Sequence, residues 1–333
     1  MKTVNKTPIW FMRQAGRYLP EYRKIRTKKK NFLDLCFSPK LAASISLQPI
    51  ERFDLDFIIL FSDILVIPHS LNQKVVFKER IGPVLNPIKT VNDLDYKNFN
   101  VCLERISAVF ETIEILKKKK GEKKLIGFCG GPFTVMNYMI EGGISVNHKK
   151  IKDFIRDSRQ EAKSIINMIT EISIEYLKRQ ILSGVDFVQV FESWAGLLEE
   201  KDFEEFIIKP NALISKKIKE FSKETQIIHF PRGAKGNILK FLKNVYCDVI
   251  SLDEEITEEA MEIIKSKDLI IQGNLHPMDL FNGGEKLQRK ILKILRRFKK
   301  HKHIFNLSHG ILPKTPIENV ERTVKIVRDF NET

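Results

Sequence analysis

Two arginines lie four residues apart in segment 8–18, which reads Pro-Ile-Trp-Phe-Met-Arg-Gln-Ala-Gly-Arg-Tyr. The planar, permanently charged guanidinium groups of Arg13 and Arg17 suit carboxylates. The Ala-Gly pair between them lets the backbone approach a ligand closely. The alternative is a surface pair of arginines that binds Glu21 or another acid. Because residues 10–12 are apolar, we expect the arginines to face a covered cavity, and the segment predicts a site for a molecule with several carboxylates.

A single carboxylate, Asp63, follows the very apolar run 56–61. An ionised carboxylate in such surroundings is costly unless hydrogen-bond donors or a cation stabilise it. One interpretation is that Asp63 caps the following turn. The other is that its charge faces the N–H groups of a ligand, or a positive charge that develops during a reaction.

Three further polar side chains could belong to the same site: Tyr138, Ser193 and His309. The Gly-rich turn 127–134 lacks the lysine and spacing of a phosphate loop, and its Pro132 has no N–H to donate. We interpret it as a tight turn that opens the helix carrying Tyr138. Ser193 is not part of a GxSxG elbow, which favours hydrogen bonding over nucleophilic attack. For His309, between a serine and a glycine, a structural role and a ligand-binding role stay equally open.

The elements that must position these residues alternate between strands and helices. Compact apolar runs, typical of strands covered on both faces, predict seven strands at 56–61, 125–128, 186–191, 226–230, 248–252, 269–272 and 303–307. Helical periodicity predicts helices at 38–53, 151–182 (one long helix or two), 201–221, 235–244, 257–266, 284–299 and 316–330. This alternation predicts a parallel sheet.

No repeat or linker divides the 333 residues, so we expect one domain over residues 1–333. At this length a (β/α)8 TIM-type barrel is the first choice and a doubly wound sheet the second. The pattern does not reveal an eighth strand. Asp63, Ser193 and His309 each follow a predicted strand, and barrel enzymes assemble their active sites at the C-terminal ends of the strands. The barrel is therefore the preferred fold.

Composition limits the function classes. The net charge of +15 comes largely from lysine runs at 28–30, 117–120 and 299–300. These runs have no interleaved aromatic residues for stacking on bases, so we expect solvated surface and no nucleic-acid partner. No apolar run is long enough for a membrane span, and the N-terminus lacks the apolar core of a signal peptide, which predicts a cytoplasmic protein. The four scattered cysteines predict buried, reduced thiols and no metal site.

Taken together, these motifs resemble the uroporphyrinogen decarboxylase family. The resemblance covers nearly the whole chain in order, and it rests on segments 8–17, 47–50, 61–66, 127–134, 138–143, 191–193, 230–233, 272–275 and 309–310. Two positions depart from the family pattern. Glu254 stands where Trp is common, and His276 stands where Asp is common.

The resemblance implies a single-domain, distorted (β/α)8 barrel, usually a homodimer. It implies a carboxy-lyase of porphyrin biosynthesis that converts uroporphyrinogen III to coproporphyrinogen III without metal or organic cofactor. By motif it assigns Asp63, Arg13 and Arg17 to catalysis. It assigns to substrate binding Arg13, Gln14, Ala15, Gly16, Arg17, Arg26, Asp63, Tyr138, Ser193 and His309.

Decarboxylation of an acetate leaves an electron pair on a methylene carbon, and a protonated pyrrole can accept it. The substrate is then its own electron sink, which explains why no cofactor motif is needed. In this hypothesis Asp63 stabilises the pyrrole cation in a pocket of low dielectric. The proton donor stays open among Arg13 or Arg17, Tyr138, a substrate carboxyl and a water, since guanidinium is a very poor acid.

Two other functions compete with this interpretation. Zinc-dependent corrinoid or thiol methyltransferases of the same barrel superfamily hold zinc with a His-x-Cys and a later Cys. The segment that looks equivalent here is His229-Phe230-Pro231, which lacks the thiolate that such a site needs. A non-enzymatic protein that binds porphyrins or acidic ligands is the third possibility, and it would release no CO2.

Overall fold

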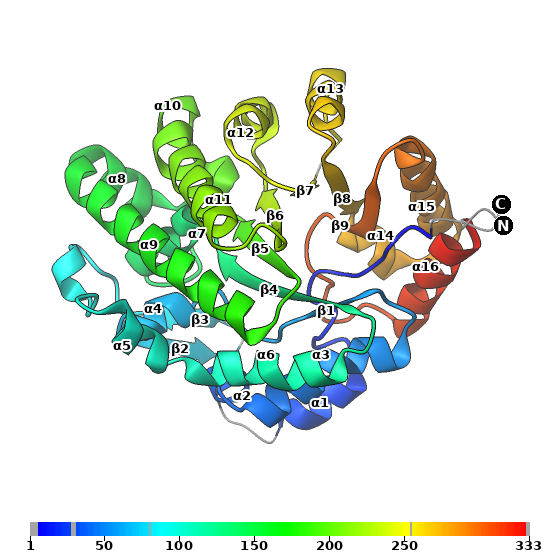
Figure 1. The fold of residues 1–333 in the computed structure, drawn as a ribbon, viewed down its shortest axis with the longest axis horizontal. Coiled ribbons are helices and arrows are strands. Elements are labelled where there is room, and N and C mark those ends of the chain that lie inside the picture. The colour runs from blue at the N-terminus through cyan, green and yellow to red at the C-terminus, as the bar shows by residue number, and fades with distance from the viewer. Residues whose placement is uncertain (1–5, 28–30, 80, 254, 331–333) are drawn as a thin grey trace.

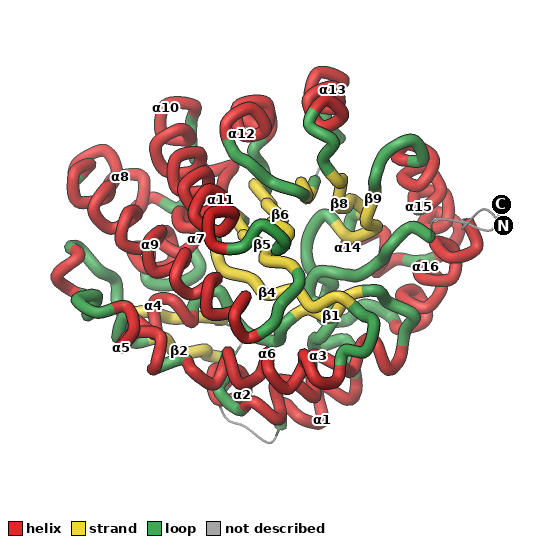
Figure 2. Tube along the Cα trace, viewed as in Figure 1, coloured by secondary structure: helices red, strands yellow, loops and turns green. Residues whose placement is uncertain are grey.

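The computed structural model describes residues 6–27, 31–79, 81–253 and 255–330. A parallel sheet of seven strands, in the order β1-β4-β5-β6-β7-β8-β9, occupies its centre. The sheet curls round the middle of the molecule and the helices lie outside it (Figure 1, Figure 2). The strands are β1 (Phe57–Ile59), β4 (Lys124–Gly130), β5 (Phe187–Glu192), β6 (Gln226–Pro231), β7 (Val249–Ser251), β8 (Ile270–Leu275) and β9 (His303–Leu307).

All seven predicted strands are therefore confirmed. Their order in the sheet follows the chain without reversal, so the doubly wound sheet, whose strand order reverses at a switch point, is the wrong alternative. Every residue of β7 and β9 is buried. Burial on both faces explains why the strands read as continuous apolar runs.

Helices connect successive strands and cover the outside of the sheet (Figure 2). They are α1 (Pro20–Arg26), α2 (Phe32–Cys36), α3 (Pro39–Arg52), α4 (Val66–Ser70), α5 (Phe99–Glu104), α6 (Ser107–Lys119), α7 (Pro132–Glu141), α8 (Lys149–Asp157), α9 (Arg159–Ser183), α10 (Glu200–Phe203), α11 (Lys209–Phe221), α12 (Ile238–Asn244), α13 (Glu258–Ser266), α14 (Pro277–Asn282), α15 (Gly284–Phe298) and α16 (Ile317–Phe330). A π-helical turn, Glu204–Ile208, joins α10 to α11.

The predicted helices are confirmed. Segment 151–182 forms two helices, because the backbone at Ser158 leaves the helical region (φ −131°, ψ 46°) between α8 and α9. An antiparallel hairpin of β2 (Val75–Lys78) and β3 (Gly82–Leu85) was not predicted. Its second strand begins with Gly82 and Pro83, residues that weaken a strand signal.

The N-terminal segment links the two edges of the sheet. The Phe305 N–H of β9 donates to Pro8 O (2.8 Å), and the Trp10 N–H donates to Phe305 O (3.3 Å). On the other side, the Asp56 N–H, just before β1, donates to Ile9 O (3.0 Å). Ile9 and Phe305 form only an isolated parallel bridge. Residues 8–10 thus lie between β9 and β1, where the sequence pattern showed no strand.

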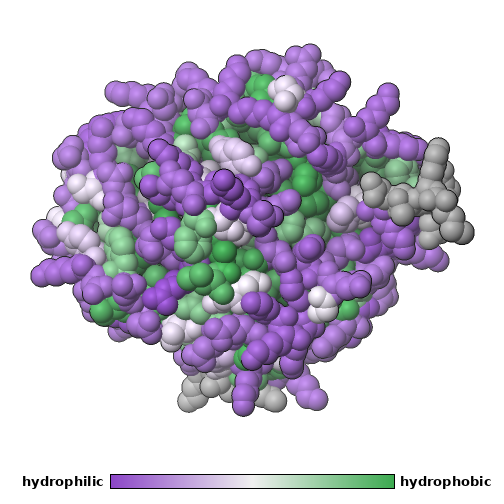
Figure 3. Space-filling view, in the orientation of Figure 1, coloured by the Kyte–Doolittle hydropathy of each residue, from purple (hydrophilic) through white to green (hydrophobic). Residues whose placement is uncertain are grey.

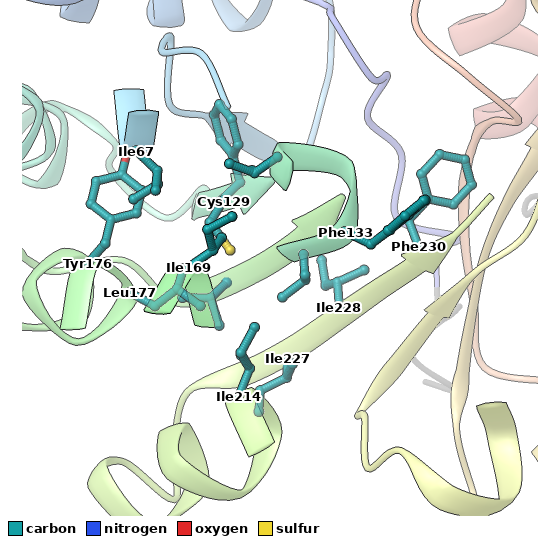
Figure 4. Close-up of a cluster of buried hydrophobic side chains, with 14 of the residues drawn as sticks. Ile67, Cys129, Phe133, Ile169, Tyr176, Leu177, Ile214, Ile227, Ile228 and Phe230 are labelled. Atoms are coloured by element: carbon teal, nitrogen blue, oxygen red, sulfur yellow. The ribbon is translucent and has the colours of Figure 1, made fainter. Parts of the chain in front are cut away.

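Apolar packing fills the space between sheet and helices. Figure 4 shows part of this core, with Ile214 of α11 beside Ile227 of β6, and Ile169 of α9 beside Cys129 of β4. The four cysteines are buried and free, as expected. Polar groups inside the sheet pair with one another. The Trp10 indole donates to Gln272 Oε1 (3.0 Å), and the Gln272 amide donates to Ser251 Oγ (3.1 Å).

The surface carries most of the charge. Figure 3 shows a largely hydrophilic rim with hydrophobic side chains towards the middle of this face. Lys117, Lys118, Lys119, Lys299 and Lys300 are exposed, as predicted, whereas Lys120 is half-buried and binds Asp186. The run 28–30 lies outside the described residues. Among the described helices, none has the length and apolar character to cross a bilayer.

Candidate active site

The backbone around Arg13 is anchored on both sides. Met12 donates its N–H to Asn306 Oδ1 (3.0 Å) and accepts from the Ile311 N–H (2.9 Å). Gln14 accepts from the Phe11 N–H (3.0 Å) and donates to Phe57 O (2.9 Å). Arg13 itself has a φ of 60° and an exposed side chain. Its neighbours therefore point into the protein while Arg13 points out of it.

Arg13 lies against the residues that follow β9. A Cβ added to Gly310 would overlap the Arg13 side chain, 2.7 Å from its Cγ. Burial, and then the positive charges of Arg13 and Arg232, lower the pKa of His309 to about 3. His309 is thus neutral near pH 7 and can donate or accept hydrogen bonds beside two arginines.

Asp63 lies after β1, half-buried, and accepts a hydrogen bond from the Leu65 N–H (2.9 Å). This bond is the turn-capping contact that one interpretation predicted. Burial raises the pKa of Asp63 to about 6, against the opposing effects of the Leu65 N–H and the charge of Arg13. The carboxylate therefore caps the turn with one oxygen and also lies within electrostatic reach of Arg13.

Tyr138 of α7 belongs to the same group of side chains. Burial raises the pKa of Tyr138, and a hydrogen bond from Trp194 opposes that rise. Asp63 and Arg13 also act on the pKa of Tyr138. Side chains from three separate segments, at 13, 63 and 138, thus lie within electrostatic reach of one another.

Arg17 and Arg26 lie around Tyr22. Burial raises the pKa of Tyr22, and the positive charges of Arg26 and Arg17 oppose this rise. The Tyr22 ring packs on the ring of Phe61 at a centroid distance of 5.8 Å. Phe61 precedes Asp63 by two residues. Glu21, the acid that could have paired with Arg13 or Arg17, binds Arg52 instead. Within the described ranges, neither Arg13 nor Arg17 forms a salt bridge with a protein carboxylate.

The Gly-rich turn before α7 is shaped by a buried carboxylate. The Glu192 carboxylate lies so close to Gly131 that a Cβ there would overlap it, 2.7 Å from Oε1. Glu192 accepts from the Thr134 N–H (2.7 Å) in the first turn of the helix. The turn is thus sterically compelled, as predicted, and its first helical N–H groups already have a protein acceptor.

The remaining predicted site residues have different environments. The side chain of Gln14 is fully buried and bonded to the main chain. Gly16 approaches the backbone closely, since a Cβ there would lie 2.9 Å from Arg13 O. Ala15 and Ser193 are half-buried.

His276, which replaces the common Asp, accepts from the Met278 N–H (3.2 Å) and caps α14. Glu254 lies outside the described residues.

Sequence reasoning missed Arg232 and Trp194. Arg232 directly follows β6 and acts on His309, so the strand-end criterion that selected Asp63 would have found it. The Trp194 side chain lowers the pKa of Tyr138, an influence that no spacing in the sequence reveals. Arg13 acts on Asp63 and, together with Arg232, on His309, whereas Arg17 and Arg26 act on Tyr22. Arginines of this kind suit a ligand with several carboxylates.

His229 has a structural role. Its Nε2 pairs with Ser215 Oγ at 2.8 Å, and both residues are fully buried. Burial lowers the pKa of His229 to about 3. Among the described residues, no three His, Cys, Asp or Glu side chains form a group that could hold a metal ion.

Solved structures with a similar fold include a methyltransferase and a B12-independent methionine synthase. The structure of a methyltransferase from Methanosarcina mazei superposes with a TM-score of 0.80 at 18% identity, covering 98% of this chain and 94% of that one. A B12-independent methionine synthase from Shewanella sp. W3-18-1 has a TM-score of 0.57 at 15% identity, with 90% of each chain covered. At such low identity the likeness concerns the fold alone, which is consistent with a TIM-type barrel.

Sequence comparisons are more specific. The family model "Uroporphyrinogen decarboxylase (URO-D)" matches residues 1–330. A uroporphyrinogen decarboxylase from Rickettsia massiliae is 45% identical over 329 residues, which is 98% of this chain and 94% of the relative. One from Rickettsia felis is 46% identical over 337 residues, covering 99% and 95%. The chain therefore belongs to the uroporphyrinogen decarboxylase family.

Proposed function

We propose that the chain is a carboxy-lyase that converts uroporphyrinogen III to coproporphyrinogen III in porphyrin biosynthesis. The observation that carries this proposal is the electrostatic coupling of Asp63, Arg13 and Tyr138, in a chain of this family. An anion and a cationic rim are what a tetrapyrrole with acidic side chains and central N–H groups requires.

The arginines bind the periphery of the substrate in this proposal. Arg13, Arg17 and Arg26 each take a substrate carboxylate, with a planar fork that matches two oxygens. The small residues Ala15 and Gly16 let the macrocycle approach the backbone, and Gln14 holds that backbone through its bond to Phe57 O. Tyr138, Ser193 and His309 complete the rim as hydrogen-bonding groups.

Asp63 supports the chemical step. A proton adds to a ring carbon of one pyrrole and makes it a cation. The bond between the acetate methylene and its carboxylate then breaks, CO2 leaves, and the electron pair moves into that pyrrole. A proton then adds to the methylene carbon, which becomes a methyl group, and the ring carbon loses the proton that it gained first, which restores the neutral pyrrole. With a pKa of about 6, Asp63 is mostly ionised at neutral pH and stabilises the pyrrole cation. No metal or organic cofactor is required.

The donor of these protons is a water or a carboxyl of the substrate. Guanidinium is too weak an acid for the role. Burial raises the pKa of Tyr138, which makes its phenol a weaker acid than usual. Arg13 and Arg17 accordingly bind substrate carboxylates, and in doing so they position the substrate against Asp63.

The architecture in this proposal is one barrel domain over residues 1–333, with the active site at the C-terminal ends of the strands. Residues 8–10 take the place of the eighth strand, supported by their bonds to Phe305 and Asp56. The protein acts in the cytoplasm as a homodimer. Sedimentation or light scattering at micromolar concentration tests the dimer, and a mass near the 38.8 kDa of one chain would contradict it.

Anaerobic incubation with uroporphyrinogen III tests the activity. Chromatography should show stepwise loss of four carboxyl groups. Tight binding without CO2 release would favour the non-enzymatic binder. Zinc-dependent methyl transfer instead would favour the methyltransferase, whose histidine position is occupied here by His229, bonded to Ser215 in the core.

A further inference from the structure

The turn that follows β6 holds one arginine in a fixed position. The Arg232 N–H donates to Glu192 O (3.1 Å) at the end of β5, and Arg232 O accepts from the Gly196 N–H (3.1 Å). The next N–H, that of Gly233, donates to the Asp253 carboxylate (2.7 Å) after β7. The loops that follow both neighbouring strands therefore fix the main chain around Arg232.

Two glycines allow this turn to pack closely. Gly233 has a φ of 74°, a backbone conformation that strains other residues. A Cβ added to Gly196 would lie 2.6 Å from Gly233 O, so the loops after β5 and β6 touch main chain to main chain. Such close packing leaves the backbone little freedom, and it sets the direction in which the Arg232 side chain leaves the turn.

The Arg232 side chain lies on the inner side of the sheet. Even-numbered residues of β6 donate to β5 with one offset, from the Gln226 N–H to Asp186 O (3.3 Å) as far as the Arg232 N–H to Glu192 O. The odd-numbered His229 faces outwards, because it bonds to Ser215 of α11. Successive side chains of a strand point to opposite faces, so the even-numbered set faces inwards.

The Arg232 guanidinium has no protein partner. It is half-buried, and among the residues that the structure describes it forms neither a hydrogen bond nor an ion pair. A charge that is partly removed from water is unfavourable unless an opposite charge faces it. A rigid turn that presents an unpaired arginine inside the sheet therefore suits an anionic ligand.

Arg232 and Arg13 lie on opposite sides of the barrel. β6 is the middle strand of the sheet, with three strands on either side of it (Figure 1). Residues 8–10 lie between the outer strands, β9 and β1, and lead to Arg13. Both positive charges nevertheless lower the pKa of His309, so the two arginines reach a common site from opposite sides.

We propose that Arg232 binds a carboxylate on the side of the macrocycle remote from Asp63, as a further specificity-determining residue. Asp63 follows β1, three strands away from β6, so the carboxylate on Arg232 is not the one that reacts. Such a contact is equally strong before and during the chemical step, and its loss raises KM without lowering kcat. This inference rests on the proposed function, because it adds a subsite for the same substrate.

Steady-state kinetics of the full-length protein with uroporphyrinogen III tests the subsite. Arg232→Gln should raise KM about tenfold or more, as loss of a charge-assisted hydrogen bond does, and should keep kcat within about twofold of wild type. Lys235→Gln is the matched control. It removes the same charge from an exposed position of the same turn, and it should leave KM within about twofold of wild type.

Two further measurements separate binding from stability. Urea unfolding should give Arg232→Gln the same midpoint as Lys235→Gln, because the guanidinium has no bond to lose. Arg232→Lys keeps the charge without the planar fork, and its KM should lie between those of wild type and Arg232→Gln. If Arg232→Gln does not fold, Arg232→Lys provides the test, with a KM expected about threefold above wild type.

The possible results distinguish the subsite from the proposed function. A folded Arg232→Gln protein with the KM of wild type would overturn the subsite, and so would an equal rise in KM for Lys235→Gln or a lower unfolding midpoint for Arg232→Gln alone. The decarboxylase would remain in each case.

Failure of the wild-type protein to release CO2 would overturn the function itself. Anaerobic equilibrium dialysis of uroporphyrinogen III would then test Arg232 without turnover. A dissociation constant about tenfold higher for Arg232→Gln would support the subsite. Equal constants, or no binding to the wild-type protein, would overturn it.

Discussion

Arg13 and Gly310 are in direct contact, although one precedes the first strand of the sheet and the other follows the last. The Arg13 side chain lies directly over the backbone of Gly310. A Cβ at position 310 would lie only 2.7 Å from Arg13 Cγ. The charge of Arg13 also lowers the pKa of His309, next to that glycine. Residues near the two ends of the chain therefore meet in the candidate active site.

Gly310→Ala should therefore weaken substrate binding. The new methyl group displaces the Arg13 side chain, and the loss of a charge-assisted contact raises KM by about tenfold or more. Gly236→Ala is the control, because nothing lies within 4 Å of a Cβ at that position. Steady-state kinetics with uroporphyrinogen III measures both. A folded Gly310→Ala protein with the KM of wild type would contradict the role of Arg13 as a clamp.

Asp63→Asn should reduce kcat more than it changes substrate binding. Removal of one preorganised charge at a developing cation lowers the rate by about a hundredfold or more. In the wild-type protein, kcat should also fall as pH drops through about 6, where Asp63 takes up a proton. The asparagine variant should lack this acidic limb. Full turnover by Asp63→Asn would exclude the cation-stabilising role.

The same aspartate should affect stability in a pH-dependent way. Its pKa is raised from 3.8 to about 6 in the folded protein, so the folded state holds this proton more tightly than the unfolded state. Protonated Asp63 therefore adds to the free energy of unfolding at low pH, and this contribution is lost as pH rises from about 4 through 6. Asp63→Asn should gain roughly 2 kcal/mol relative to wild type between pH 4.5 and pH 8. Urea unfolding at the two pH values measures this gain, with the exposed Asp34→Asn as control. A gain that does not depend on pH would contradict the raised pKa.

Trp10→Phe should destabilise the link between the sheet edges. Trp10 and Gln272 are both fully buried, and the indole donates to Gln272 Oε1 at 3.0 Å. Loss of the donor leaves a buried acceptor unpaired, at about 1–3 kcal/mol. Adding Gln272→Met removes that acceptor and should recover part of the loss. Equilibrium urea unfolding checks both variants, and a Trp10→Phe protein as stable as wild type would show that the bond contributes nothing.

The sequence predicted the regular part of the fold because that part obeys periodic rules. Strands covered on both faces are largely apolar, so β6 and β9 were identified nearly to the residue. Segment 8–10 was not predicted as a strand, because it forms only one bridge pair, between Ile9 and Phe305. Its partners are set by tertiary structure, and no local period records them.

Motifs predicted the site residues less evenly than the strands. Arg13 and Asp63 were identified by charge at the edge of apolar runs, and the structure places them within electrostatic reach. Gln14 was predicted to bind the substrate because it belongs to the segment 13–17. Its side chain is instead buried and donates a hydrogen bond to Phe57 O. A linear motif does not tell which side chains point inwards. Trp194 was missed for the related reason that its partner, Tyr138, comes from another element.

The bonds of Pro8 and Trp10 to Phe305 have a consequence for synthesis of the protein. Phe305 leaves the ribosome long after Arg13 has been made. The segment that holds Arg13 therefore lacks its pairing partner until β9 has been synthesised. Such a distant pairing is slow to form, because the intervening loop must first be closed. An incomplete chain would therefore not bind the porphyrinogen, and a ligand held by Arg13 would in turn keep the two ends of the chain together.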